Sequence, residues 1–289
     1  MKLQTSVTFP ASRIPVTPED RVMVIGSCFA DQIGTRMAHA GFQACVNPFG
    51  TLYNPISVAN ALSRLSEGRH FTESECVEMG AGAGLVCSFS HHTSFARPTA
   101  EAFLETANEA LEDAAAIWQD CNKVLLTLGT IFCYVHDGAV VANCLKRPAA
   151  EFEKLEMSLE QVTAVLRSIV INNPGKEFIF TVSPIRHLAD GAHLNQLSKS
   201  TLLLAVDALQ RDPMIGQRCE YFPAYEIVLD ELRDYRFYAE DMVHPTAQAA
   251  GYIWERFLDF AVPASYRSGI VEAEKAWRAS QHRPMHEKA

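Results

Sequence analysis

Apolar residues form two kinds of pattern along the chain, and these predict strands and helices in alternation. Short continuous apolar runs with β-branched residues, such as residues 22–26, are typical of strands buried on both faces of a parallel sheet. Stretches with apolar residues three or four positions apart are typical of helices that bury one face. Two local signals add to this: Ser158 is a predicted helix cap, and Asp137 and Gly138 are predicted to turn a hairpin over 131–141. The predicted strands are 22–26, 42–46, 124–128, 177–182 and 217–222, and the predicted helices are 30–40, 56–65, 99–120, 158–171, 196–210 and 245–260.

The alternation of strands with helices predicts an α/β fold. We expect a three-layer α/β/α sandwich around a five-stranded, mostly parallel sheet, with helices on both faces. Residues 1–262 are assigned to this domain, and the glycine-rich residues at about 66–98 are assigned to an irregular insertion. Residues 263–289 form a more polar tail, in which a surface helix is predicted over 270–280.

Composition narrows the class of partner. Of the 289 residues, 48% are hydrophobic, which suits a globular core, and the net charge of −9 disfavours binding to nucleic acid. The chain has neither an apolar run long enough to span a membrane nor the apolar segment of a secretory signal near its start, so a cytoplasmic protein without a membrane partner is expected. The eight cysteines form no CxxC pair and are interpreted as reduced thiols. No metal and no cofactor are predicted, and the oligomeric state is left open.

Polar residues follow three of the predicted strands at the edge where open parallel sheets bind ligands. They are Ser27, Thr130 and the segment 183–187. Ser27 follows the first strand and begins a helix, where N–H groups and the helix dipole favour developing negative charge. It is therefore a candidate nucleophile that needs a base. The alternative is that Ser27 only caps the helix that follows.

The required base is found in the sequence Asp241-x-x-His244-Pro245. At this spacing the carboxylate of Asp241 can hold the imidazole of His244 and stabilise its protonated form. Pro245 suits the first position of the next helix. Short Asp/His spacings also arise by chance on protein surfaces. The chain order Ser, Asp, His is what makes this pair a candidate catalytic set.

Five blocks of the chain resemble the GSCFA family, which is named for the pentapeptide found here at residues 26–30. The resemblance covers roughly residues 20 to 260, and the family is regarded as a divergent relative of the SGNH (GDSL-type) esterases. It implies a flavodoxin-like sheet and a Ser/His/Asp mechanism. The blocks are GSCFA at 26–30, NPFG at 47–50, TLGT at 127–130, TVSPIRH at 181–187 and DMVHP at 241–245.

The resemblance also implies roles for single residues. Ser27 matches the nucleophile, Asp241 and His244 match the terminal block, and Gly50 matches a glycine whose N–H helps bind the oxyanion. The chain departs from the SGNH pattern twice. No Asp precedes Ser27, and Thr130 stands where an Asn side chain is usual. The predicted oxyanion hole is therefore Ser27, Gly50 and Thr130.

Cys28 is a rival nucleophile, because it also lies near a helix N-terminus, where thiol pKa values fall. Its side chain is expected to point away from that of Ser27 and to fill the core. The remaining candidates are His91, His92, Arg186 and His187, which we predict to bind substrate. The insertion that holds His91 and His92 is able to fold over the site as a lid. A polar, partly cationic pocket suits an anionic or carbohydrate substrate.

These residues together predict a serine hydrolase that cleaves a small acyl ester, for which an acetylated carbohydrate is one candidate. Two alternatives remain open. An O-acyltransferase would form the same acyl-enzyme and pass the acyl group to a hydroxyl instead of water. A catalytically inactive SGNH-like module would bind a glycan or a protein without turnover.

Overall fold

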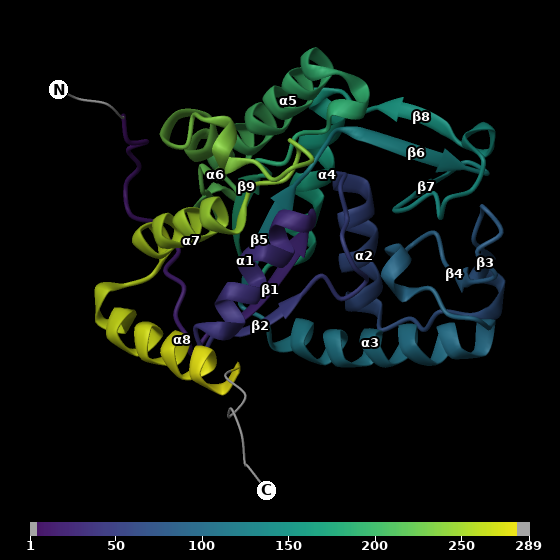
Figure 1. Ribbon diagram of the computed structural model, residues 1–289, viewed down its shortest axis with the longest axis horizontal. Coiled ribbons are helices and arrows are strands. Elements are labelled where there is room, and N and C mark those ends of the chain that lie inside the picture. The colour runs from purple at the N-terminus through teal and green to yellow at the C-terminus, as the bar shows by residue number, and fades with distance from the viewer. Residues whose placement is uncertain (1–4, 282–289) are drawn as a thin grey trace, which may run out of the picture.

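The fold is built on one sheet in which all neighbouring strands are parallel. The computed structural model describes residues 5–281. The strands are β1 (Arg21–Gly26), β2 (Gln43–Val46), β5 (Lys123–Leu128), β9 (Glu177–Val182) and β10 (Cys219–Tyr221). They stand in the order β2-β1-β5-β9-β10 (Figure 1). This order confirms the predicted five-stranded sheet of flavodoxin-like type and shows it to be entirely parallel.

The central strands are buried on both faces, which is why they appear in the sequence as continuous apolar runs. Along β1, Val24 packs into one core and Met23 into the other. Helices α1 (Cys28–His39), α7 (Ala247–Ala261) and the short α6 (Ala224–Glu226) cover the first face. Helices α2 (Pro55–Glu67), α3 (Ala100–Asp120), α4 (Leu159–Asn172) and α5 (Ala192–Arg211) cover the second. The three-layer prediction is confirmed.

The predicted helix starts are right in one case and wrong in another. Ser158 caps α4 with its side chain, as predicted, and Gln161 completes a capping box. Helix α7, in contrast, begins after Pro245. Its cap is Thr246, whose hydroxyl accepts a hydrogen bond from the N–H of Ala249 at 3.2 Å. Pro245 instead lies in a short bridge with Tyr238, so it belongs to the loop and not to the first turn of the helix.

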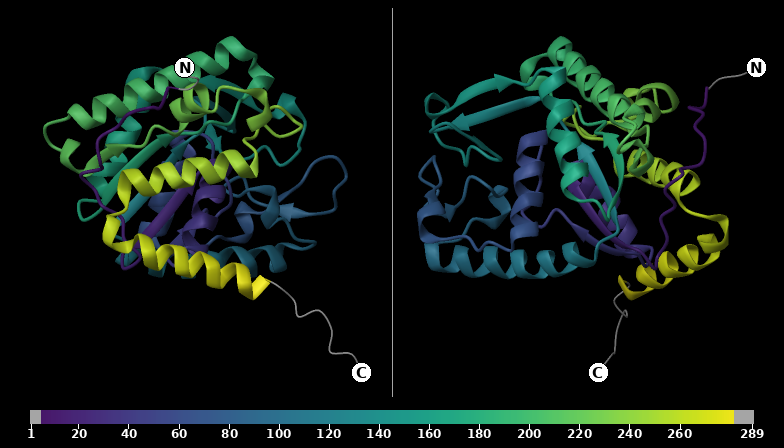
Figure 2. Two further views of the ribbon diagram at one scale, coloured as in Figure 1. Left: turned by 60° about the vertical axis from the view of Figure 1, so that its left-hand side comes forward. Right: turned by 180° about the vertical axis from the view of Figure 1, so that it is seen from behind.

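Near the end of the described chain, helix α8 (Arg267–Gln281) covers the stretch predicted as a surface helix. It lies beside α1 and α7 (Figure 2). The ring of Trp277 stacks on that of His39 at 3.4 Å between centroids. Residues 282–289 of the predicted tail lie outside the described residues.

Two small antiparallel sheets extend from one side of the molecule (Figure 1). The predicted insertion contains the first, made of β3 (Val77–Glu78) and β4 (Val86–Cys87). The second contains β6 (Phe132–His136), β7 (Ala139–Val141) and β8 (Glu153–Glu156). Its hairpin turns at Asp137 and Gly138, as predicted. Strand β8 was not predicted, because all of its residues are exposed and leave no buried apolar pattern in the sequence.

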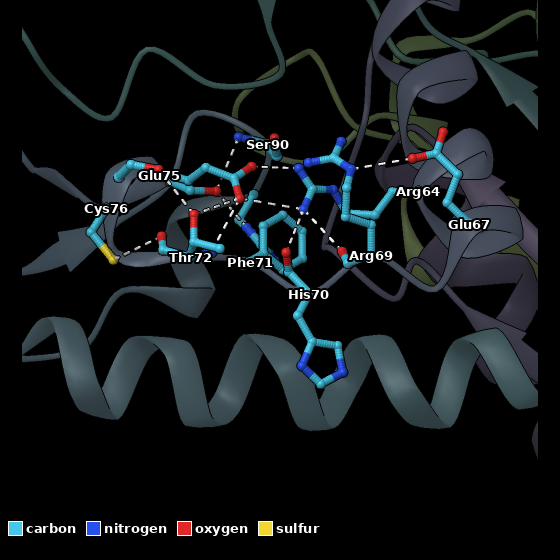
Figure 3. A network of polar contacts seen from close by, with 12 residues as sticks. Arg64, Glu67, Arg69, His70, Phe71, Thr72, Glu75, Cys76 and Ser90 are labelled. Carbon is cyan, nitrogen blue, oxygen red and sulfur yellow. Dashed lines mark hydrogen bonds and ion pairs between the residues drawn. The ribbon is translucent and has the colours of Figure 1, made fainter.

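The start of the insertion is anchored to α2 by a buried arginine (Figure 3). Arg64 pairs with Glu75 and donates to the carbonyl oxygens of Arg69 at 3.1 Å and His70 at 3.3 Å. Its guanidinium lies 3.9 Å from the ring centroid of Phe71. A buried charge needs such partners, because an unpaired one is costly. This network fixes the chain that leaves α2 against the helix.

We expect Arg64→Met to lower the free energy of unfolding by about 2 kcal/mol, because it removes charge-assisted hydrogen bonds from a buried site. Urea unfolding followed by circular dichroism measures this loss. Arg69→Met is the matched control: Arg69 pairs with Glu67 on the surface, where ion pairs contribute less than about 1 kcal/mol. Equal losses in the two variants would contradict an anchoring role for Arg64.

Candidate active site at the carboxyl edge of the sheet

The candidate site begins where β1 approaches β5 too closely for a side chain. Gly26 has a φ of +136°, and a Cβ atom there would lie 2.0 Å from the carbonyl oxygen of Thr127. The N–H of Ser27 donates to the same oxygen at 3.1 Å. Asn47 accepts from the N–H of Gly26 at 2.8 Å. These contacts fix the path of the chain from the strand into α1.

Ser27 is fully buried, with 0% exposure. Its Oγ accepts a hydrogen bond from the N–H of Phe29 at 3.3 Å and caps α1. Ser27 therefore has the capping role that the sequence offers as the alternative to a nucleophile. Its role as nucleophile stays a prediction.

Asp241 makes three hydrogen bonds within its loop, two of them to His244. Its Oδ1 accepts from the N–H groups of Val243 at 2.9 Å and His244 at 3.0 Å, and its Oδ2 lies 2.6 Å from His244 Nδ1. The two backbone donors, followed by the imidazole, lower the pKa of Asp241 to about 2. The carboxylate is thus ionised at neutral pH and accepts only, so the Nδ1 proton points to it and the Nε2 lone pair is left for another partner.

That partner is Cys28. Its Sγ lies 3.5 Å from His244 Nε2, within hydrogen-bonding range for sulfur. Cys28 is half-buried and stands at the first position of α1, and it is not the fully enclosed core residue that was expected. A signal was available in the sequence. In the G-D-S block of the GDSL-type esterases, the serine stands two residues after the glycine, and Cys28 likewise stands two residues after Gly26. If Cys28 matches that serine, Ser27 stands at the position of the Asp in the block, which explains why no Asp precedes Ser27.

The surroundings keep the thiol of Cys28 protonated in the resting protein. Burial, and then the carboxylate of Asp31, raise the pKa of Cys28 to about 11. The N–H groups at the start of α1 and the ammonium of Lys199 act in the opposite direction. Asp31 in turn accepts a hydrogen bond from Asn47 at 2.6 Å. A nucleophilic Cys28 therefore needs a base, and His244 is in contact with it.

The donors of the two other predicted oxyanion residues have partners within the fold. The N–H of Gly50 donates to the carbonyl of Asn47 at 2.7 Å. The N–H of Thr130 donates to the carbonyl of Tyr53 at 2.9 Å, and the Thr130 hydroxyl lies 3.2 Å from the Ser198 hydroxyl. Both oxyanion assignments stay predictions.

The predicted substrate-binding histidines occupy different environments. His91 has 0% exposure and lies among the rings of Phe49, Phe71, Phe95 and Phe103, with its Nδ1 2.7 Å from the Ser88 hydroxyl. Burial lowers the pKa of His91 to about 3, so the ring is neutral and enclosed. Such a ring cannot meet a ligand at the surface without a rearrangement of its neighbours.

His92 and His187 lie closer to the sheet edge. The N–H of His92 donates to the carbonyl of Phe49 at 2.9 Å. Burial raises the pKa of Asp31, and the nearby His92 acts against this rise. Burial lowers the pKa of His187 to about 4, and its ring packs edge-on against Tyr53. The insertion thus reaches the edge of the site through His92. Substrate contact by these two residues stays a prediction.

Arg186 contacts the loop that carries the Asp241–His244 pair. Its N–H donates to the carbonyl of Val243 at 3.1 Å, and its Nη1 donates to the carbonyl of Met242 at 2.9 Å. The guanidinium lies 5.2 Å from the ring centroid of Tyr238 and lines a cavity of about 470 Å³. Arg186 therefore holds the loop, and it borders a cavity whose lining includes Tyr238, the bridge partner of Pro245.

We expect Arg186→Ala to increase amide hydrogen exchange in the peptide that contains Asp241 and His244. Loss of a charge-assisted hydrogen bond at a half-buried site is worth about 1–2 kcal/mol, which corresponds to roughly tenfold faster exchange. Arg233→Ala is the control, since Arg233 lines the same cavity but its side chain is exposed and pairs with Asp230. Unchanged protection of the loop in Arg186→Ala would rule out the holding role.

Comparison with known proteins agrees with the resemblance seen in the sequence. A model of the GSCFA family matches residues 21–257. Comparisons with curated proteins and with solved structures found no match. Within residues 5–281, no helix is both long and apolar enough to cross a membrane, and no group of three or more His, Cys, Asp or Glu side chains is arranged to hold a metal ion. Because the family match covers most of the chain, the protein belongs to the GSCFA family.

Proposed function

We propose that this protein is an acyl-ester hydrolase in which Cys28 is the nucleophile, His244 the general base and Asp241 the residue that orients it. The contact of 3.5 Å between Cys28 Sγ and His244 Nε2 carries the proposal. The 2.6 Å contact between His244 Nδ1 and Asp241 completes the nucleophile–base–carboxylate arrangement of acyl-transfer enzymes.

The reaction proceeds in two halves. His244 Nε2 takes the proton from Cys28 Sγ while the sulfur attacks the acyl carbon and the carbonyl oxygen becomes negative. The C–O bond to the leaving alcohol then breaks, His244 returns the proton to that oxygen, and a thioester remains on Cys28. In the second half, water loses a proton to His244 and attacks the thioester. The carboxylic acid departs, and the thiol recovers its proton from His244.

The start of α1 supports negative charge at this position. The N–H groups of Cys28 and Phe29 lower the pKa of the thiol, in keeping with the positive end of a helix dipole. Asp241 stabilises the imidazolium that forms when His244 accepts the proton. With its pKa at about 2, it keeps its charge as the pH falls through the range in which imidazole titrates.

We base the substrate class on two features: the exposure of the His244–Asp241 pair, and a partly aromatic cavity that Arg186 borders. The side chains of His244 and Asp241 are 42% and 49% exposed, so this part of the site is open enough for a bulky leaving group. The neighbouring cavity is lined by Arg186, Tyr235, Tyr238 and Leu229. A small acyl group on a larger polar alcohol suits this arrangement, and an acetylated carbohydrate is our preferred substrate. Transfer of the acyl group to a sugar hydroxyl would use the same steps.

We expect Cys28→Ala to abolish both hydrolysis of p-nitrophenyl acetate and covalent labelling of this site by an acylating probe, because the attacking atom is lost. Ser27→Ala should keep Cys28 labelling, although loss of the helix cap lowers stability by about 1 kcal/mol. Peptide mass mapping identifies the labelled residue. His244→Asn should lower turnover about as strongly as Cys28→Ala, since members of such a set act as a unit.

Cys144→Ala serves as the matched control, since Cys144 is also half-buried but lies outside the site. The alternatives give different results. Labelling on Ser27 that persists in Cys28→Ala would restore the serine mechanism. Labelling of neither residue would favour the inactive binding module. An acyl-enzyme that is released by a sugar faster than by water would identify a transferase.

A further inference from the structure

A lysine with no exposed surface lies near the carboxyl edge of the sheet. Lys199 belongs to α5 and is 0% exposed. Its Nζ donates to the carbonyl oxygen of Gly129 at 2.6 Å. Among residues 5–281, the ammonium has this carbonyl as its hydrogen-bond partner, and no carboxylate pairs with it. Burial of an ammonium without a carboxylate is costly, so this position calls for an explanation beyond packing.

The location of Lys199 connects it to Cys28. Gly129 directly follows β5, the strand that pairs with β1 next to the turn that holds Cys28. The charges of Lys199 and Cys28 act on each other: the ammonium lowers the pKa of the thiol, and the thiolate raises that of the lysine. The charge of Lys199, although buried, therefore affects the thiol at the carboxyl edge of the sheet.

We propose that Lys199 is a positioning residue that stabilises the negative charge formed on Cys28 when His244 removes the thiol proton. This inference rests on the function proposed above and adds the cation that its mechanism needs. The charge acts through a medium that excludes water, where electrostatic interactions are stronger than at the surface.

Other charged or titratable groups also face Cys28 and shape the effect. On α1, Asp31 opposes thiolate formation. His244 contacts the sulfur from the loop before α7, and Tyr53 interacts with Cys28 from the segment before α2. His187, in the segment after β9, interacts with Lys199. Lys199 is thus the buried cation whose effect on the pKa of the thiol opposes that of Asp31.

The titration of Lys199 gives a second, independent signature. Burial lowers the pKa of Lys199 to about 7, and Cys28 acts in the opposite direction. Between about pH 7 and the ordinary lysine pKa near 10.4, the unfolded chain therefore binds a proton that the folded chain does not. This linkage makes stability rise with pH across that window. Replacement of Lys199 by a neutral residue should remove this part of the slope.

The decisive experiment measures alkylation of Cys28 by iodoacetamide from about pH 6 to about pH 10, with the Cys28 peptide quantified by mass spectrometry, since the thiolate is the reactive form. In Lys199→Met, we expect alkylation at and below about pH 7, where Lys199 still carries its charge, to become up to roughly tenfold slower, and the two profiles to meet at higher pH, where Lys199 has lost its charge. Lys199→Gln keeps a donor for Gly129 without the charge, and it should give the same change if the Met variant fails to fold.

Lys176→Met is the matched control. Lys176 is also buried, also donates to carbonyl oxygens, and also lies beside a cysteine, Cys121, but at the amino end of β9. Its loss should change stability and leave the Cys28 profile in place. An unchanged profile in folded Lys199→Met and Lys199→Gln would overturn the proposal and leave Lys199 a structural residue. The expected change together with full hydrolysis by Cys28→Ala would keep the inference about Lys199 and reject Cys28 as the nucleophile.

Discussion

The contact between Gly26 and the backbone of β5 is the constraint on which the candidate site depends. Because a Cβ atom at Gly26 would lie 2.0 Å from the Thr127 oxygen, only glycine allows the first strand to end here. The chain must then turn at once, so Ser27 folds back to cap α1 and Cys28 becomes the first helical residue. The turn thus buries the hydroxyl and leaves the thiol half-exposed. Asn47 ties this turn to Asp31 by hydrogen bonds at both ends of its amide.

The opposite half of the site is a loop that holds its own shape. Met242 adopts a φ of +57°, and Asp241 closes the turn with two backbone hydrogen bonds before it reaches the imidazole. Arg186 fixes the same loop to the segment after β9. His244 is therefore oriented by contacts that lie within a few residues and one neighbouring segment. An exposed pair can act as a catalytic dyad only if its geometry is fixed in this way.

The sequence was sufficient for the sheet and for the Asp241–His244 contact, but not for which of Ser27 and Cys28 contacts His244. Buried strands leave continuous apolar runs, and a spacing of three residues already brings Asp241 to His244. Ser27 and Cys28, however, are neighbours in the sequence. Successive residues point about 100° apart around a helix, so the position at which the helix begins decides which of the two side chains faces His244. Lys199 was missed because a lysine in an amphipathic helix is normally solvated. His91 was read as polar, whereas its ring belongs to an aromatic cluster.

The thiol of Cys28 is protonated at rest, whereas the proposed reaction needs a thiolate. The two are compatible only if His244 removes the proton and Lys199 then stabilises the charge that forms. With a pKa of about 11, Cys28 does not form a stable ion pair with His244 at rest, so the thiol is protected from adventitious oxidants and alkylating agents. Charge appears on sulfur only as His244 accepts the proton during attack. At that moment the helix N-terminus and Lys199 are already in place, so little reorganisation is needed. Before substrate binds, the carboxylate of Asp31 repels a negative charge on the sulfur and so disfavours the thiolate. This repulsion falls when the sulfur shares its electron pair with the acyl carbon.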